Sequence, residues 1–188
     1  IENAIDAGST EITCEIREGG KSYIRVTDNG CGIPEDQFET AFKRHATSKI
    51  NEFNDLYLIH SLGFRGEALT SIVSVAKVTA RSRTADSKIG TELKYENGTV
   101  ISKQPVAMPV GTEIIVDDIF YNIPVRRGFM KSQASEASKI SALLYSLAIG
   151  NPSVSISYIK DDRRVFHTKK ENTFNENLLL LFGMDYYD

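Results

Sequence analysis

The stretch Ser61-Leu62-Gly63-Phe64-Arg65-Gly66-Glu67-Ala68-Leu69 places two glycines directly before an apolar, helix-forming run. Gly63 and Gly66 can adopt positive φ, and neither has a side chain that would block close approach of the backbone. A helix that begins here presents unpaired N–H groups to an anion. The stretch therefore predicts a phosphate-binding loop that leads into a helix over residues 66–74, although such a turn also occurs as ordinary loop geometry.

A second glycine turn follows an alternating strand upstream, in Val26-Thr27-Asp28-Asn29-Gly30-Cys31-Gly32-Ile33. The Asp28 carboxylate, at the end of that strand, can accept a hydrogen bond from an exocyclic amine such as the N6 group of adenine. Gly30 and Gly32 would let a flat ring lie against bare backbone. The alternative is a tight turn in which Asp28 bonds to its own backbone. The residues alone leave both interpretations open.

The first residues, Ile1-Glu2-Asn3-Ala4-Ile5-Asp6-Ala7-Gly8, predict a short helix that ends at Gly8. Mg²⁺ prefers hard oxygen ligands and usually shares them with substrate phosphates. The carboxamide oxygen of Asn3 is therefore a candidate ligand for Mg²⁺. An asparagine in a helix more often faces solvent, and that interpretation also stays open.

Further stretches make the sequence similar to a known family. They are Arg44-His45-Ala46-Thr47-Ser48-Lys49, the Gly63–Leu69 loop, and Asp118-Ile119-Phe120-Tyr121-Asn122-Ile123-Pro124-Val125-Arg126-Arg127. The order also matches: a helix bearing Asn, a strand ending in Asp-x-Gly-x-Gly, a glycine-containing lid, and Gly111-Thr112 opening a later strand. This arrangement resembles the GHKL ATPase superfamily, and within it most closely the MutL mismatch-repair family of bacterial type. The resemblance covers residues 1 to about 168.

The resemblance implies a site for ATP and Mg²⁺. Asp28 would read the adenine amino group beside Gly30 and Gly32, Thr112 would support that contact, and Asn3 would hold Mg²⁺. The lid would line the nucleotide and bind its phosphates through Thr47, Ser48, Lys49, Gly63, Phe64, Arg65, Gly66, Glu67, Ala68 and Leu69. In this family the general base is a glutamate four residues before the Asn, so we expect it before residue 1 and expect the chain to lack it.

The same resemblance implies a slow, Mg²⁺-dependent ATPase in the full protein. Nucleotide would order the lid segments 44–60 and 61–66 and favour a homodimer that signals to the mismatch-recognition protein MutS. Two alternatives remain: a histidine-kinase-like domain of the same superfamily, and a nucleotide-free interaction domain that keeps the fold. The kinase alternative lacks a dimerisation helix with an acceptor histidine, because His45, His60 and His167 are scattered along the chain.

Composition favours a folded domain in the cytoplasm. The chain has 188 residues, 41% of them apolar, and a formal net charge of −3, which gives no global sign of nucleic-acid binding. Cys14 and Cys31 form no C-x-x-C pair and are expected to be reduced, and no long apolar span indicates a membrane partner. A weak contact with the DNA backbone would have to come from local cations, namely Arg126, Arg127 and Lys131, or Arg81 and Arg83.

The hydrophobic patterning predicts an α+β fold, a two-layer sandwich of a mostly antiparallel mixed sheet with helices on one face, as in GHKL ATPases. We expect strands at 11–17, 22–28, 75–83, 89–95, 99–104, 112–118, 153–159 and 163–168, with a hairpin turn at Asn97-Gly98. We expect helices at 35–43, 66–74 and 134–149, the last burying Ala137, Ile140, Leu143, Leu144 and Leu147. Residues 1–168 would form the ATPase domain without its first helix, and 169–188 a truncated start of a second, transducer domain. The Leu178–Leu181 run could instead belong to an amphipathic helix that packs on the first domain.

Overall fold

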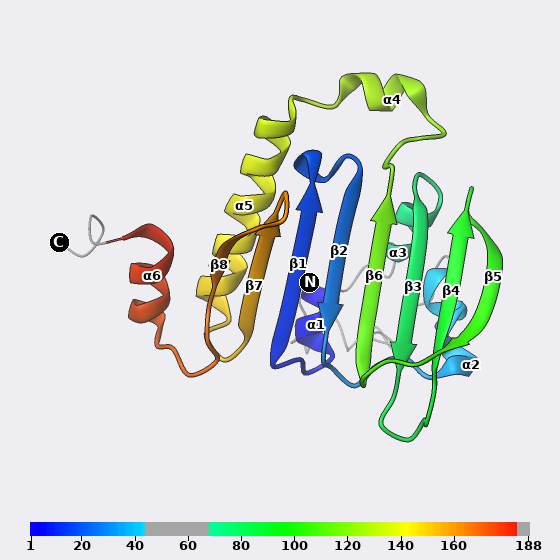
Figure 1. The fold of residues 1–188 in the computed structure, drawn as a ribbon, viewed down its shortest axis with the longest axis horizontal. Coiled ribbons are helices and arrows are strands. Elements are labelled where there is room, and N and C mark those ends of the chain that lie inside the picture. The colour runs from blue at the N-terminus through cyan, green and yellow to red at the C-terminus, as the bar shows by residue number, and fades with distance from the viewer. Residues whose placement is uncertain (44–67, 184–188) are drawn as a thin grey trace, which may run out of the picture.

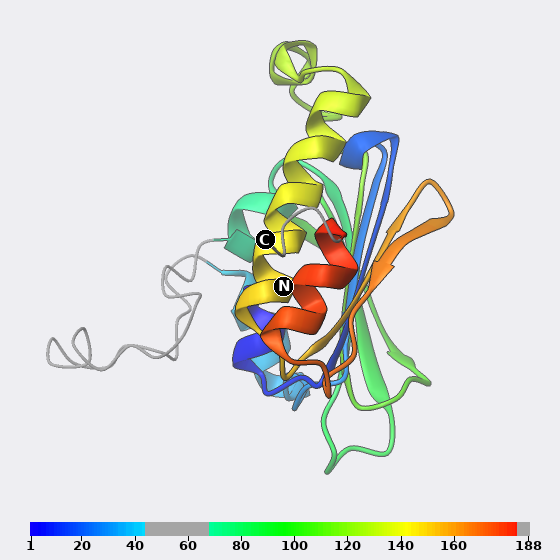
Figure 2. The same cartoon turned by 90° about the vertical axis from the view of Figure 1, so that its left-hand side faces the viewer.

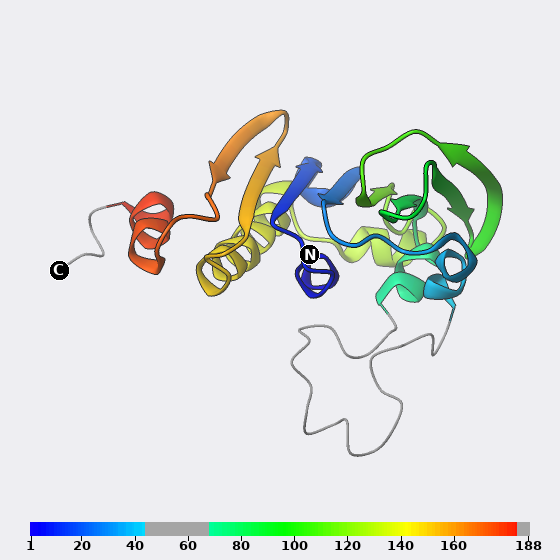
Figure 3. The same ribbon diagram turned by 90° about the horizontal axis from the view of Figure 1, so that it is seen from below.

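The computed structural model describes residues 1–43 and 68–183. Within these ranges an eight-stranded sheet has the strand order β5-β4-β3-β6-β2-β1-β7-β8 (Figure 1). The pair β1–β7 is parallel and the other neighbouring pairs are antiparallel. Figures 2 and 3 show helices against one face of the sheet and leave the other face open. The predicted α+β sandwich with a mostly antiparallel mixed sheet is confirmed.

The strands lie where the sequence predicted them, with bounds shifted by one or two residues. They are β1 (Glu11–Arg17), β2 (Tyr23–Asp28), β3 (Lys77–Arg83), β4 (Gly90–Glu96), β5 (Thr99–Val106), β6 (Gly111–Asp117), β7 (Ser155–Lys160) and β8 (Arg163–His167). The helices are α1 (Glu2–Asp6), α2 (Glu35–Phe38), α3 (Ala68–Val73), α4 (Pro124–Phe129), α5 (Gln133–Gly150) and α6 (Phe174–Phe182), with 3-10 turns η1 (Glu18–Gly20) and η2 (Thr40–Phe42). The turn between β4 and β5 is the predicted one, because Asn97 and Gly98 both have positive φ.

Two apolar clusters fill the space between the sheet and the helices. The first lies under α1 and α5 and includes Ile12, Ile16, Leu144 and Tyr158. The second lies under α2 and α3, and its fully buried members include Phe38, Ala76, Ala80 and Leu93. Ile24 of β2, between them, is partly buried and packs against both. The sheet is therefore apolar on its helix-covered face along most of its length.

Two predictions about the helices were wrong in detail. The single helix expected at 35–43 is α2 followed by η2, and the tighter turn places the Phe42 ring 4.8 Å from that of Tyr95. Leu143, expected in the buried stripe of α5, is 57% exposed. Ala137, Leu144 and Ala148 form the buried face instead, and Leu143 points about 100° away from Leu144 because successive residues turn by that angle.

The last helix, α6, packs beside α5 and does not stand apart from it. Its start is fixed by a capping box, in which Thr173 and Glu176 bond to each other's backbone N–H groups. Asn177 is fully buried and donates from Nδ2 to the carbonyl of Ala148. The rings of Tyr145 and Phe182 lie 5.5 Å apart. This packing agrees with the amphipathic-helix alternative, while a domain boundary after residue 168 stays a prediction.

The open face of the sheet carries a chain of ion pairs. Arg25 of β2 lies 2.7 Å from Glu15 and 4.0 Å from Glu113. Arg81 of β3 lies 2.8 Å from Glu113 and 2.6 Å from Glu92. We name these five residues the charge ladder; it crosses five neighbouring strands, β1, β2, β6, β3 and β4. Because Arg81 is paired on both sides, it is not the unengaged surface cation that the sequence suggested for DNA.

Candidate nucleotide-binding site

One transverse row of the sheet breaks the apolar pattern of the helix-covered face. Asp28 at the end of β2 lies opposite Thr112 at the start of β6, and Thr112 lies opposite Ser82 near the end of β3. Their side chains point to the helix-covered face, because Val26 and Ile114, two residues along, pack against the core. We call Asp28, Thr112 and Ser82 the polar row. It lies at the lower end of the sheet in Figure 1, and Ile12 of the first apolar cluster lies opposite Asp28 in β1.

The Asp28 carboxylate is held on one oxygen only. Oδ1 accepts hydrogen bonds from the backbone N–H of Gly30, at 2.9 Å, and of Thr112, at 3.3 Å. Within the described ranges Oδ2 has no recorded hydrogen bond. The bond to Gly30 is the local Asx-type contact that the sequence left as an alternative. It does not exclude a ligand, since it orients the carboxylate and leaves a second acceptor for an amine.

Two glycines beside this row are required by close backbone packing. Gly32 has φ +72°, and a Cβ there would collide with the carbonyl of Arg83. Gly111 has φ +133°, and a Cβ there would collide with the carbonyl of Asp28. Any other residue would push β6 or the turn after β2 out of place. The glycine turns therefore set the spacing of the polar row, and Gly32 lies beside it, while its contact with a ligand stays a prediction.

The first helix lies against the same turn. Cys31 donates its N–H to the carbonyl of Ala7, and a Cβ on Gly30 would lie 2.8 Å from the Cβ of Ala7. Asn3, four residues before Ala7, shares its face of α1 and is exposed. The amide of Asn3 is thus on the side of the helix that adjoins the glycine turn. Both the ligand role and the solvent-facing role remain compatible with this position.

Most of the predicted lid lies outside the described residues. This applies to Thr47, Ser48, Lys49, Gly63, Phe64, Arg65, Gly66 and Glu67. Ala68 and Leu69 are described and form the first turn of α3. Leu69, Ile72 and Val73 anchor α3 on the second apolar cluster. The predicted helix after the lid is therefore present from residue 68.

Sequence reasoning missed Ser82, which is only 2% exposed. Its Oγ accepts a hydrogen bond from the N–H of Ile33 at 2.8 Å. The same Oγ lies 3.0 Å from the carbonyl oxygen of Gly111 and 3.1 Å from Oγ1 of Thr112. The alternation of Val78, Ala80 and Ser82 places this hydroxyl on the core side of β3. That pattern was the available signal, because a serine that ends an apolar alternation needs partners.

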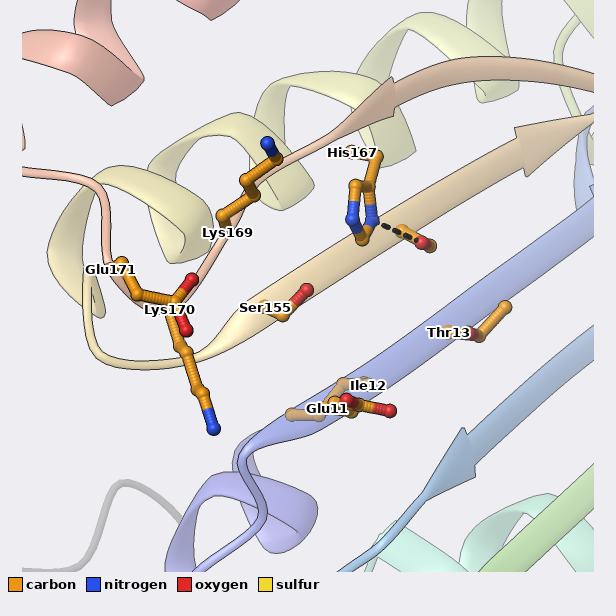
Figure 4. Close-up of a pocket in the computed structure, with 9 residues that line it drawn as sticks. Glu11, Ile12, Thr13, Ser155, His167, Lys169, Lys170 and Glu171 are labelled. Carbon is orange, nitrogen blue, oxygen red and sulfur yellow. Dashed lines mark hydrogen bonds between the residues drawn. The ribbon is translucent and has the colours of Figure 1, made fainter.

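A cavity of about 250 Å³ lies elsewhere, on the open face of the sheet (Figure 4). Its lining comes from β1, β7, β8 and the segment after β8, and includes Glu11, Thr13, Ser155, His167 and Lys169. His167 Nδ1 lies 2.7 Å from Oγ of Ser157. The polar row is on the opposite face, so this cavity is separate from the glycine turns. No group of three or more metal-binding side chains occurs within residues 1–43 and 68–183.

The basic segment around α4 lies at the other end of the sheet from the polar row (Figure 1). Arg127 is 3.6 Å from Asp118, and the guanidinium of Arg126 lies over the Phe120 ring. Both arginines remain on the surface. They do not contribute to the glycine turns, and the predicted DNA contact would be a separate surface.

The two cysteines have contrasting environments and are both free thiols. Cys14 is buried, and burial raises the pKa of its thiol to about 11. Cys31, in the glycine turn, is exposed.

No helix in the described part of the chain has the length and apolar character needed to cross a membrane.

Comparison with known proteins shows the family of this chain. Residues 1–113 match the family of histidine kinase-, DNA gyrase B-, and HSP90-like ATPases. The chain is 46% identical over 185 residues to the DNA mismatch repair protein MutL of Agathobacter rectalis, covering 98% of this chain and 28% of that protein. It is 44% identical to MutL of Thermoanaerobacter pseudethanolicus over 187 residues, covering 100% and 30%. The chain thus spans about three tenths of the length of these relatives.

A solved structure shares the fold and is similar in sequence. The Aquifex aeolicus MutL ATPase domain complexed with ADP superposes with a TM-score of 0.80 at 34% identity, covering 96% of this chain and 64% of that one. The predicted class of protein is confirmed by the family match and by this likeness. The chain belongs to the family of histidine kinase-, DNA gyrase B-, and HSP90-like ATPases, and within that family it is a homologue of MutL.

Proposed function

We propose that this chain is the ATP-binding module of a MutL-type mismatch-repair ATPase and that Asp28 reads the adenine amino group. The observation that supports this most is the carboxylate of Asp28, which is fixed on Oδ1 by two backbone N–H groups and accepts no hydrogen bond on Oδ2 from the residues that the structure describes. An ionised carboxylate only accepts hydrogen bonds, so it selects an amine. The solved relative named above is a complex with ADP, which supports a nucleotide as the ligand.

The glycine turn and Thr112 complete the proposed adenine contact. The N–H of Thr112 holds Asp28, and the Thr112 side chain lies next to it in the polar row. The backbone of residues 30–32, packed closely against α1 and the end of β3, would lie along one side of the ring. These groups are in place through the sheet register, so binding requires little rearrangement of them.

Asn3 is the proposed Mg²⁺ ligand from this chain. Its carboxamide oxygen is of the hard type that Mg²⁺ prefers, and its place on α1 adjoins the glycine turn. The bound ion would neutralise phosphate charge. Asn3 would orient it from the helix, and phosphate oxygens and water would supply the remaining ligands. We assign no general base among the residues of this chain.

Calorimetric titration with ADP tests the adenine assignment. Asp28→Asn preserves the shape and an acceptor for the two backbone donors, but it presents an amide N–H to the adenine amine. A hydrogen bond to a charged group contributes about 1.5–3 kcal/mol, so affinity should fall about ten- to a hundred-fold. Asp117→Asn, the same change at the far end of β6, is the matched control and should leave affinity unchanged. Equal affinity of Asp28→Asn and wild type would remove Asp28 from the site.

The Mg²⁺ assignment is tested by the same titration with and without the ion. Asn3→Ala should leave ADP affinity in chelator unchanged and abolish the gain in affinity that Mg²⁺ gives the wild type. Asn29→Ala is unsuitable as a control, because Asn29 directly follows Asp28 and its Oδ1 holds the backbone beside the glycine turn. Asn151→Ala, at the end of α5, is remote and serves instead. A full Mg²⁺ gain in Asn3→Ala would contradict the assignment.

For the whole protein we propose slow ATP hydrolysis, homodimerisation on ATP binding, signalling to MutS in the cytoplasm, and a weak DNA-backbone contact through Arg126, Arg127 and Lys131. These roles rest on the likeness to MutL. The DNA contact is tested in the full-length protein at low salt, where charge reversal of Arg126 and Arg127 should weaken binding to any sequence equally. Sedimentation of the full-length protein with a non-hydrolysable ATP analogue tests dimerisation, which Asp28→Asn should prevent.

A further inference from the structure

Ser82 is a buried hydroxyl with three polar neighbours. Ile33 donates its backbone N–H to Oγ at 2.8 Å. The carbonyl oxygen of Gly111 is 3.0 Å away and Oγ1 of Thr112 is 3.1 Å away. These neighbours come from the glycine turn after β2 and from the start of β6. Ser82 therefore joins the two backbone segments that flank Asp28.

The direction of these bonds follows from the number of hydrogens. A hydroxyl has one hydrogen to donate and two lone pairs. The carbonyl of Gly111 can only accept, so Ser82 satisfies it by donating its one hydrogen there. Ile33 occupies one lone pair of the Ser82 oxygen, and the remaining lone pair can accept the hydrogen of Thr112. In this arrangement every group is satisfied, which buried polar groups require.

The consequence falls on Thr112. With its hydrogen committed to Ser82, the Thr112 oxygen can only accept a hydrogen bond from a ligand. Asp28, its neighbour in the polar row, is also an acceptor. Two acceptors side by side match a base that carries an amino group and repel one that carries a carbonyl oxygen at the same position.

We infer that Ser82 is a positioning residue that sets base selectivity: it fixes the Thr112 hydroxyl as an acceptor and so favours 6-aminopurine over 6-oxopurine nucleotides. This inference rests on the proposed nucleotide site. Without the Ser82 oxygen, the Thr112 hydroxyl is free to rotate and donate to a carbonyl oxygen at the purine 6-position. Loss of Ser82 should therefore reduce the preference of the site for the 6-amino base over the 6-oxo base.

The experiment compares ADP with inosine diphosphate by calorimetry. The two nucleotides differ only in the 6-amino or 6-oxo group and its effect on the ring. The ratio measured is the dissociation constant of inosine diphosphate divided by that of ADP. For Ser82→Ala this ratio should fall about fivefold, which corresponds to the free energy of one neutral hydrogen bond. Ser82→Cys keeps a weak donor and a weak acceptor in a slightly larger side chain, and should give an intermediate ratio.

A double-mutant cycle separates positioning from a general structural effect. In Thr112→Val the hydroxyl is absent, so adding Ser82→Ala should leave the ratio unchanged if Ser82 acts through Thr112. The matched control is Ser141→Ala, which removes a part-buried hydroxyl bonded to Ala137 and Tyr158 in the first apolar cluster. This control should lower thermal stability without changing the ratio.

Each outcome has one meaning. A wild-type ratio retained in Ser82→Ala and Ser82→Cys, including an equal loss of both affinities, overturns the role of Ser82 and leaves the proposed ADP site intact. A further change of the ratio in the Thr112→Val background also overturns it. Failure of the wild type to bind ADP overturns the proposed function itself. A reduced ratio that disappears in the Thr112→Val background supports the inference.

Discussion

Replacing Arg81 by methionine tests the charge ladder on the open face of the sheet. The Arg81 guanidinium donates from Nε to Glu92 at 2.6 Å and from Nη1 to Glu113 at 2.8 Å. Methionine keeps much of the apolar stem and removes the charge. Its two carboxylate partners then remain in place, and the side chain of Glu92 is only 4% exposed.

The magnitude follows from the burial of the partners. Exposed ion pairs contribute about 0–1 kcal/mol, and breaking a fully buried pair costs about 3–5 kcal/mol. Arg81 is one-third exposed, and Glu92 keeps Gln104 at 2.8 Å as a second donor. We therefore expect Arg81→Met to lower the free energy of unfolding by about 2 kcal/mol at pH 7, between those limits.

The loss of unfolding free energy in Arg81→Met should become smaller as the pH falls. Burial works to raise the pKa of Glu92, but the hydrogen bonds from Arg81 and Gln104 lower it below its ordinary value of 4.5. A carboxyl with a lowered pKa stabilises the fold above its unfolded pKa and loses that contribution as the pH falls through the folded pKa. The difference between wild type and Arg81→Met should therefore be full at pH 7 and shrink as the pH falls below about 4.5.

Urea denaturation at several pH values measures this difference. The control is Arg127→Met, whose partner Asp118 lies outside the ladder and is 46% exposed, so a much smaller loss is expected. Equal losses in Arg81→Met and Arg127→Met at pH 7 would refute a contribution from burial of the ladder. A loss that stays constant down to pH 3 would refute the role of the Glu92 carboxylate.

Three further predictions concern the turns, the thiols and the last helix. Gly111→Ala should lower the free energy of unfolding by about 3 kcal/mol or more, because φ +133° and a backbone collision both oppose a Cβ; thermal melting measures it. A thiol reagent at pH 8 should modify Cys31 in the native protein and reach Cys14 only in denaturant, since the pKa of Cys14 is raised to about 11 by burial; modification of both native thiols would contradict the buried position. Thr173→Ala removes the capping box with Glu176 and should cost about 1 kcal/mol, a fall in Tm of about 2–4 °C, whereas an unchanged Tm would show that α6 adds nothing to stability.

The strands could be predicted because their signal is local. Alternation of period two marks strands such as β3, and Asn97-Gly98 fixes its hairpin through positive φ at both residues. The break between α2 and η2 could not be predicted in this way. The Phe42 ring at this break packs on Tyr95, which is distant in sequence, and local patterning does not reveal that contact.

In the candidate site, too, the local contacts could be predicted and the contacts between distant segments could not. Asp28 was identified because the glycines beside it are visible in the sequence, and its local bond to Gly30 was foreseen as an alternative. Its second bond comes from Thr112, and only the pairing of β2 with β6 brings that donor close. Ser82 was missed for the same reason, since its partners lie in two other segments.

The surface cations show a further limit of sequence reasoning. Arg81 and Arg83 share a face of β3, as alternation predicts. The sequence does not reveal that Glu92 and Glu113 lie directly opposite Arg81 in the neighbouring strands. The strand register pairs Arg81 with these two carboxylates, and that register depends on the whole sheet.

The most direct test is a crystal structure of the chain with ADP and Mg²⁺ bound. We predict the adenine amino group within hydrogen-bonding distance of Asp28 Oδ2, with the ring against residues 30–32 and the Asn3 amide oxygen on the metal. Adenine bound in another place, such as the open-face cavity beside His167 and Lys169, with Asp28 Oδ2 facing solvent, would contradict the proposed site.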